Sequence, residues 1–192
     1  MNKEFKLIPY GISNFKQVRQ ENKYLVDKTM YFEKMELAGN FLFFERPRRF
    51  GKSLFLNMLE AYYDINEKDH FDELFRGLYV AEHPTENRNK YQVLHLDFSL
   101  VGSNLERLSE DFNRYCGQEL DSFAASYSRY YAPGFVEDVR SEPSAIGKMN
   151  LIRIAAKKLN LKLYLIVDEY DNFTNNVLNV KGHEAYHALT HG

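Results

Sequence analysis

The sequence predicts an α/β protein built on a mainly parallel sheet. Short apolar runs of strand length alternate along the chain with longer helical patterns, and no stretch has the composition of a linker. Strands that alternate with helices imply βαβ units, which pair their strands in parallel. The 192 residues, 44% of them hydrophobic, suffice for one domain with a real core. We therefore expect a single domain over 1–192, with a lead-in at 1–37 and the core at 38–192.

Each element is expected from a local pattern. Residues 24–37 favour a short extended piece followed by a helix. The apolar run 41–44 is typical of a strand that is covered on both faces, and from Ser53 the apolar residues recur at helical spacing. The later elements are a strand at 91–99, an amphipathic helix at 104–131, a helix at 144–159 and a strand at 161–169.

Composition excludes several classes of protein. A net charge of −2 gives the whole chain no electrostatic affinity for nucleic acid. The single Cys116 excludes an internal disulfide framework and suits the cytoplasm, where we expect the protein to reside. No apolar run approaches the length of a membrane span, so we expect no membrane partner.

The stretch RPRRFGKS at 46–53 has the form of a phosphate-binding loop, or Walker A motif. In such a loop, backbone N–H groups at the start of a helix point at phosphate oxygens and the helix dipole adds positive potential. Lys52 would reach the terminal phosphates, and the Ser53 hydroxyl would ligate Mg²⁺. The predicted nucleotide-binding residues are Arg46, Pro47, Arg48, Arg49, Phe50, Gly51, Lys52, Ser53 and Leu54.

Arg46 departs from the usual pattern G-x-x-x-x-G-K-[ST], because it replaces the first glycine. Pro47 biases the preceding residue towards extended geometry, in which an arginine is accommodated. The clustered arginines suit a polyphosphate, since guanidinium groups match phosphate oxygens. The alternative is a solvated basic turn.

The strand expected at 161–169 ends in Asp168 and Glu169, the form of a Walker B motif. Asp168 would hold Mg²⁺, and Glu169 would be the catalytic residue that orients and polarises the attacking water, together with Lys52 on the phosphates. The alternative is a strand that ends in solvent with two acidic residues.

The chain resembles the AAA-ATPase-like domain proteins, in which the RPRRFGKS form is normal. The resemblance covers nearly the whole chain, through IPYGISNFKQVRQENKYLVDKTMYF, FLFFERPRRFGKSLFLNMLEAYY, YQVLHLDFS and LYLIVDEYDNF. It implies a P-loop NTPase-like three-layer sandwich that binds ATP with Mg²⁺ and hydrolyses it. Members often carry a C-terminal nuclease domain, which implies nucleic acid as a partner of such a domain. Residues Tyr24–Thr29 are a hallmark that we expect to lie against the nucleotide; the alternative is a structural role for this segment.

The resemblance also implies elements that residues 173–192 do not show: a sensor strand, a lid and the nuclease domain. We therefore expect an N-terminal part of a longer protein, with a sheet that is incomplete at its C-terminus. Expressed alone, this part is expected to be prone to aggregation and inactive as an ATPase.

Specific motifs bear on the alternatives to an ATPase. HEAYH at 183–187 matches the zinc-protease pattern H-E-x-x-H, but Gly182 directly precedes the first histidine and no third ligand follows at the right distance. A guanine-reading N-K-x-D motif is absent, because NKYL and NKYQ lack the aspartate. A small-molecule kinase would share the loop but seldom the Asp-Glu pair. A non-hydrolysing nucleotide-binding or interaction domain remains the main alternative.

Overall fold

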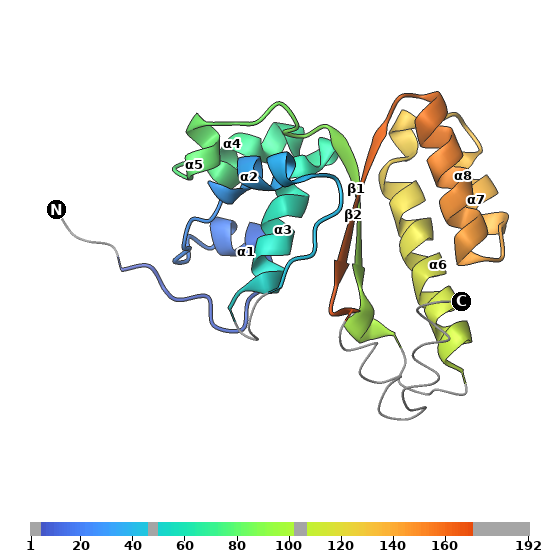
Figure 1. The fold of residues 1–192 in the computed structure, drawn as a ribbon, viewed down its shortest axis with the longest axis horizontal. Coiled ribbons are helices and arrows are strands. Elements are labelled where there is room, and N and C mark those ends of the chain that lie inside the picture. The colour runs from blue at the N-terminus through green and yellow to red at the C-terminus, as the bar shows by residue number, and fades with distance from the viewer. Residues whose placement is uncertain (1–4, 46–49, 102–106, 171–192) are drawn as a thin grey trace. The chain divides into compact units, whose positions relative to one another are not determined.

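The computed structural model describes residues 5–45, 50–101 and 107–170. These residues form eight α-helices and a two-stranded parallel sheet, which confirms the α/β class (Figure 1). The chain divides into two compact units, residues 1–91 and residues 92–192. The single domain over 1–192 stays a prediction.

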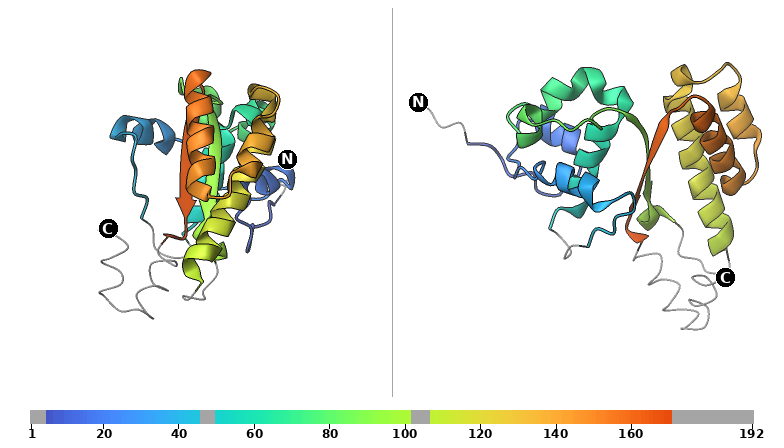
Figure 2. Two further views of the ribbon diagram at one scale, coloured as in Figure 1. Left: turned by 90° about the vertical axis from the view of Figure 1, so that its right-hand side faces the viewer. Right: turned by 45° about the horizontal axis from the view of Figure 1, so that its top comes forward.

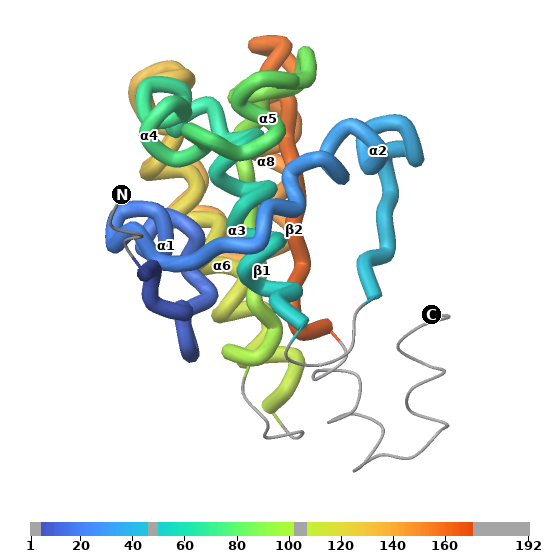
Figure 3. Tube along the Cα trace, turned by 90° about the vertical axis from the view of Figure 1, so that its left-hand side faces the viewer, coloured from blue at the N-terminus to red at the C-terminus, as the bar shows by residue number. Residues whose placement is uncertain are grey.

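The first unit is a cluster of helices around α3 (Lys52–Tyr63), which confirms the helix expected from Ser53. Helices α1 and α4 both contact α3, and Figure 3 follows the chain through this unit. The remaining elements are α1 (Phe15–Gln20), α2 (Tyr31–Ala38), the 3-10 helix η1 (Ile65–His70), α4 (Phe71–Phe75) and α5 (Tyr79–Glu82).

Aromatic rings fill the core of the first unit. The Phe32 ring lies 4.9 Å from the Tyr62 ring and 5.8 Å from the Phe55 ring between centroids, and all three side chains are buried. The Phe15 and Phe75 rings join α1 to α4 at 5.1 Å. Because each aromatic ring removes a large area from water, short helices can build a core with few residues. This accounts for much of the high aromatic content.

Residues 41–44 form no strand, so the prediction of a strand there is wrong. Phe41 is 99% exposed and Phe43 is 70% exposed, while the Phe44 ring stacks on Phe55 at 5.0 Å. A short apolar run does not by itself distinguish a strand from other structure, because a strand also needs a neighbour for its backbone hydrogen bonds. In the described part of the chain, the sheet contains β1 and β2 alone.

The second unit is a βαβ arrangement. Strand β1 (Tyr91–Asp97) starts at the boundary of the units and pairs in parallel with β2 (Lys162–Asp168). The views in Figure 1 and Figure 2 agree that α6 and α8 cover one face of this sheet. These bounds confirm the two strands and the two helices expected after residue 90, with ends that differ by a few residues, whereas the helix Phe135–Ser141 was not expected. Residues 102–106 lie outside the described residues. The connecting elements are η2 (Phe98–Leu100), α6 (Leu108–Ser126), η3 (Ser128–Tyr130), α7 (Phe135–Ser141) and α8 (Ala145–Lys158).

Helix α8 begins where its sequence provides a cap. The Ser144 side chain accepts a hydrogen bond from the Gly147 N–H at 3.0 Å, which satisfies one of the N–H groups left over at a helix start. The buried Lys148 ammonium donates to the Asp121 carboxylate of α6 at 2.5 Å. This pair fixes α8 against α6, because a buried lysine without its carboxylate would be costly.

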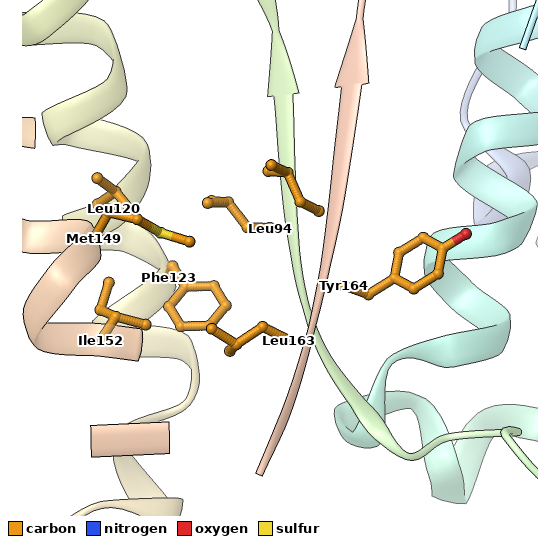
Figure 4. Close-up of a pocket in the computed structure, with 8 residues that line it drawn as sticks. Leu94, Leu120, Phe123, Met149, Ile152, Leu163 and Tyr164 are labelled. Carbon is orange, nitrogen blue, oxygen red and sulfur yellow. The ribbon is translucent and has the colours of Figure 1, made fainter. Parts of the chain in front are cut away.

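The side chains of β2 alternate between the two faces of the sheet. Figure 4 shows Leu163 pointing towards Phe123 and Ile152 of the helices, whereas Tyr164 points away from them. Because successive strand residues face opposite sides, Asp168 lies on the same face as Tyr164. Among the described residues, no helix is both long and apolar enough to cross a membrane.

Tyrosine hydroxyls occupy the edge of β1 that faces away from β2. The Tyr127 hydroxyl accepts from the Val93 N–H at 2.9 Å and donates to the Val93 carbonyl at 3.4 Å. The Tyr115 hydroxyl accepts from the Asp97 N–H at 2.7 Å. A strand residue directs its N–H and its C=O to the same side, so these groups point away from β2. At these residues β1 is therefore a closed edge of the sheet, and a further strand would add beside β2.

Removal of the Tyr127 hydroxyl is expected to destabilise the second unit. In the Tyr127→Phe variant, the buried N–H and C=O of Val93 lose their shared partner, which costs about 1–3 kcal/mol. Urea unfolding measures the loss. Tyr130→Phe is the matched control, because the Tyr130 hydroxyl contacts the exposed Arg129 guanidinium. Equal stabilities of the two variants would contradict the role of Tyr127.

Candidate functional site

Gly51, at the start of α3, has a backbone conformation that is compatible with a phosphate loop. Gly51 is the N-cap of α3 and adopts a left-handed conformation, with φ 73° and ψ 35°. A residue with a side chain would be strained there, which explains the glycine. The Gly51 carbonyl accepts from the Phe55 N–H at 3.0 Å and starts the helix. Helix geometry leaves the N–H groups of the first turn without an i−4 carbonyl, so they are suited to an anion.

The described residues of the predicted loop lie together at this turn. Lys52 and Ser53 are the first two residues of α3 and are half-buried, as is Leu54, while Phe50 is 62% exposed. The Ser53 carbonyl accepts from the Asn57 side chain at 3.1 Å one turn later. The other predicted nucleotide-binding residues, Arg46, Pro47, Arg48 and Arg49, lie outside the described residues.

The hallmark segment Tyr24–Thr29 lies beside this turn. The Lys28 ammonium is 3.5 Å from the Phe50 carbonyl oxygen and 3.8 Å from the position that a Cβ on Gly51 would take. Asp27 and Thr29 face the other way, towards α5. The sequence identifies this segment as a family hallmark, but no sequence pattern predicts the contact of Lys28 with Phe50.

Asp27 and Thr29 together cap the start of α5. The Asp27 carboxylate accepts from the Thr29 N–H at 2.8 Å and from the Tyr79 N–H at 2.7 Å. The Thr29 hydroxyl donates to Asp27 at 2.7 Å and accepts from the Val80 N–H at 3.1 Å. Thr29 is buried, so these bonds tie the segment firmly to α5. Two of the hallmark residues thus have a structural role.

Asp168 and Glu169 lie at the carboxyl end of β2, as expected. Asp168 is 3% exposed, and its carboxylate accepts from the Glu169 N–H at 2.8 Å. Glu169 has a φ of 54°, whereas the other non-glycine residues with positive φ in the described ranges are asparagines. Asparagine tolerates this conformation, but for glutamate it costs about 1–2 kcal/mol. Backbone strain of this kind is typical of functional positions. No sequence pattern predicts it at Glu169.

The two halves of the predicted site belong to different units. Gly51, Lys52 and Ser53 lie in residues 1–91, and Asp168 and Glu169 lie in residues 92–192. Their meeting in one site, with Mg²⁺ held by Ser53 and Asp168, stays a prediction. Each half has the right donors for it: a hydroxyl in the first helical turn, and a buried carboxylate at a strand end.

Among the described residues, the other reactive groups form no second centre. Burial raises the pKa of the Cys116 thiol to about 11, with the nearby Glu119 charge adding to the shift, so this cysteine is protonated and inert at neutral pH. Within the described ranges, no group of three or more His, Cys, Asp or Glu side chains could hold a metal ion. The histidine motif at 183–187 lies outside them.

A left-handed glycine precedes the lysine-serine start of α3, and a buried aspartate ends β2; a phosphate-loop protein would also have both features. Residues 9–192 match the family described as "Predicted AAA-ATPase". The chain belongs to this family, which confirms the resemblance found in its sequence.

A relative of unstated function extends the comparison. It is described as "Uncharacterized protein in vnfD 5'region", from Azotobacter chroococcum mcd 1, and is 32% identical over 167 residues. The match covers 86% of this chain and 29% of the relative. The chain therefore spans about a third of the length of this relative. No solved structure matches the chain.

Proposed function

We propose that the chain binds ATP with Mg²⁺ at the turn formed by Gly51, Lys52 and Ser53. The observation that carries this proposal is the left-handed Gly51 at the start of α3, with Lys52 and Ser53 in its first turn. A helix start of this kind offers backbone N–H groups to a polyphosphate, and Lys52 would supply an ammonium group beside them. Family membership supports nucleotide binding in general.

We further propose hydrolysis of the bound ATP by the full-length protein. Bound Mg²⁺ would neutralise charge on the phosphates. Ser53 and Asp168 would hold the ion, Lys52 would bind the terminal phosphates, and Glu169 would orient and polarise the attacking water. The strained backbone of Glu169, supported by the Asp168 carboxylate, favours a fixed direction for its side chain.

The fold proposed for the complete module is a phosphate-loop three-layer sandwich. The closed outer edge of β1 supports it, because further strands would then add beside β2. Asp168 would in that case lie at an interior strand of the sheet. We place the protein in the cytoplasm, and we propose that nucleotide state is coupled to another part of the full-length protein, such as a nuclease-like domain that acts on nucleic acid.

Calorimetric titration of the full-length protein with Mg-ATP and Mg-GTP tests the proposal. We expect saturable binding of Mg-ATP at one site per chain and weaker binding when Mg²⁺ is removed with EDTA, because the metal screens the phosphate charges. GTP is expected to bind less tightly, since the sequence has no guanine-reading motif. Absence of ATP binding would refute the proposed function.

A further inference from the structure

Lys28 brings an additional positive charge to the start of α3. Its ammonium lies 3.5 Å from the Phe50 carbonyl oxygen and 3.8 Å from the Cβ position of Gly51. Phe50 and Gly51 immediately precede Lys52, so Lys28 approaches the same turn from a segment more than twenty residues earlier in the chain. A hydrogen bond of 3.5 Å is at the outer limit of length and is weak.

The backbone that carries Lys28 is held on both sides. Asp27 accepts from the Tyr79 N–H at 2.7 Å, and Thr29 accepts from the Val80 N–H at 3.1 Å. Both contacts tie the segment to α5, and the Thr29 side chain is 1% exposed. Because Asp27 and Thr29 are fixed, the backbone of Lys28 is already ordered. Little conformational entropy is then lost when its ammonium binds a ligand at the loop.

The electrostatics of this position favour an anion. The N-terminus of α3 carries the positive end of a helix dipole, and Lys52 stands at its first residue. A lysine next to a helix N-terminus is unfavourable by itself, because charges of like sign are close together. A ligand with several negative charges reverses that balance. The arrangement of Lys28, Lys52 and the helix start therefore suits a polyphosphate better than a single carboxylate.

We propose that Lys28 is a second phosphate-binding lysine, which contacts the polyphosphate of the bound nucleoside triphosphate beside Lys52. This inference rests on the proposed function and assigns a role to the hallmark segment. Asp27 and Thr29 fix the segment, and Lys28 binds the ligand.

The test compares Lys28→Met, Lys28→Arg and Lys68→Met in the full-length protein. Methionine keeps the length of the side chain without its charge, and Lys68 is an exposed control on η1. Calorimetry measures the affinity for Mg-ATP, and inorganic tripolyphosphate serves as a competing probe. We expect Lys28→Met to weaken binding of both by about tenfold, as for the loss of one charge-assisted hydrogen bond. Lys28→Arg should retain most of the affinity, and Lys68→Met all of it.

The unfolding temperature of the ligand-free protein separates binding from support of the loop. A phosphate contact predicts the same temperature in Lys28→Met as in the parent. The inference would be overturned if Lys28→Met lowered both the ATP affinity and the unfolding temperature, and if Lys28→Arg did not restore the affinity. Lys28 would then have a structural role in supporting the loop. Unchanged ATP affinity in Lys28→Met, with Lys52→Ala unable to bind, would overturn it and leave the proposed function intact. A parent protein that binds neither ATP nor tripolyphosphate would refute both.

Discussion

Replacement of Lys52 by alanine is expected to abolish ATP binding by the full-length protein. Lys52 is the first residue of α3, directly after the left-handed Gly51, and in the proposed function its ammonium binds the terminal phosphates. Truncation of one partner of a desolvated charge pair typically costs about 2–5 kcal/mol. This corresponds to a loss in affinity of about 30-fold to 5,000-fold. Calorimetric titration with Mg-ATP measures the change.

The stability of the Lys52→Ala variant distinguishes lost binding from lost folding. A cation at a helix N-terminus opposes the helix dipole, and alanine is the best helix former. The ligand-free variant should therefore unfold at the same temperature as the parent, or slightly above it. Lys68→Ala, at an exposed position in η1, is the matched control and should bind ATP normally. Tight ATP binding by Lys52→Ala would mean that the nucleotide lies elsewhere.

The second unit could be predicted well from sequence because its patterns are long and its boundaries are chemically marked. Ser144 caps α8, and the run that ends in Asp168 forms β2. Tyr115, Leu120 and Phe123 of α6 are buried, as the amphipathic pattern expected at 104–131 implies for one face of that helix. Long periodic segments fix the type of an element even where its ends differ by a few residues.

The prediction of a strand at 41–44 failed because strand formation depends on a neighbouring strand and not only on the composition of the segment. Four apolar residues suit a covered strand, but backbone hydrogen bonds must come from a neighbouring strand. Phe41 and Phe43 are instead exposed, and Phe44 packs on α3 through Phe55. Local composition contains no information about such a neighbour.

The sequence predicts which residues form the candidate site, but it predicts only part of their geometry. Gly51, Lys52 and Ser53 follow a motif whose spacing reflects the turn they form. Lys28 is brought to Phe50 by contacts of its neighbours with α5, which are tertiary and have no local pattern. The left-handed φ of Glu169 contradicts the local preference of glutamate, so propensity predicts the opposite.

If the full-length protein hydrolyses ATP as proposed, replacement of Glu169 by glutamine is expected to preserve ATP binding and to reduce turnover by about 10²–10⁴-fold. Glutamine has the same shape but cannot take a proton or polarise water as a carboxylate does. The bond from the residue 169 N–H to Asp168 involves the backbone, so it survives the change and the turn keeps its form. Phosphate release and calorimetry on the same preparation measure the two effects.

Two further variants test whether the loss of turnover is specific to the Glu169 carboxylate. Glu137→Gln removes an exposed acidic group from α7 of the same unit and should leave turnover unchanged. Asp168→Asn, at the buried neighbour, should instead raise the Mg²⁺ concentration that half-maximal activity requires, because an amide is a weaker ligand than a carboxylate. Unchanged turnover in Glu169→Gln would remove Glu169 from the mechanism. A parent protein that binds ATP but releases no phosphate would favour a non-hydrolysing nucleotide-binding module, in which the strained turn after β2 serves the bound state alone.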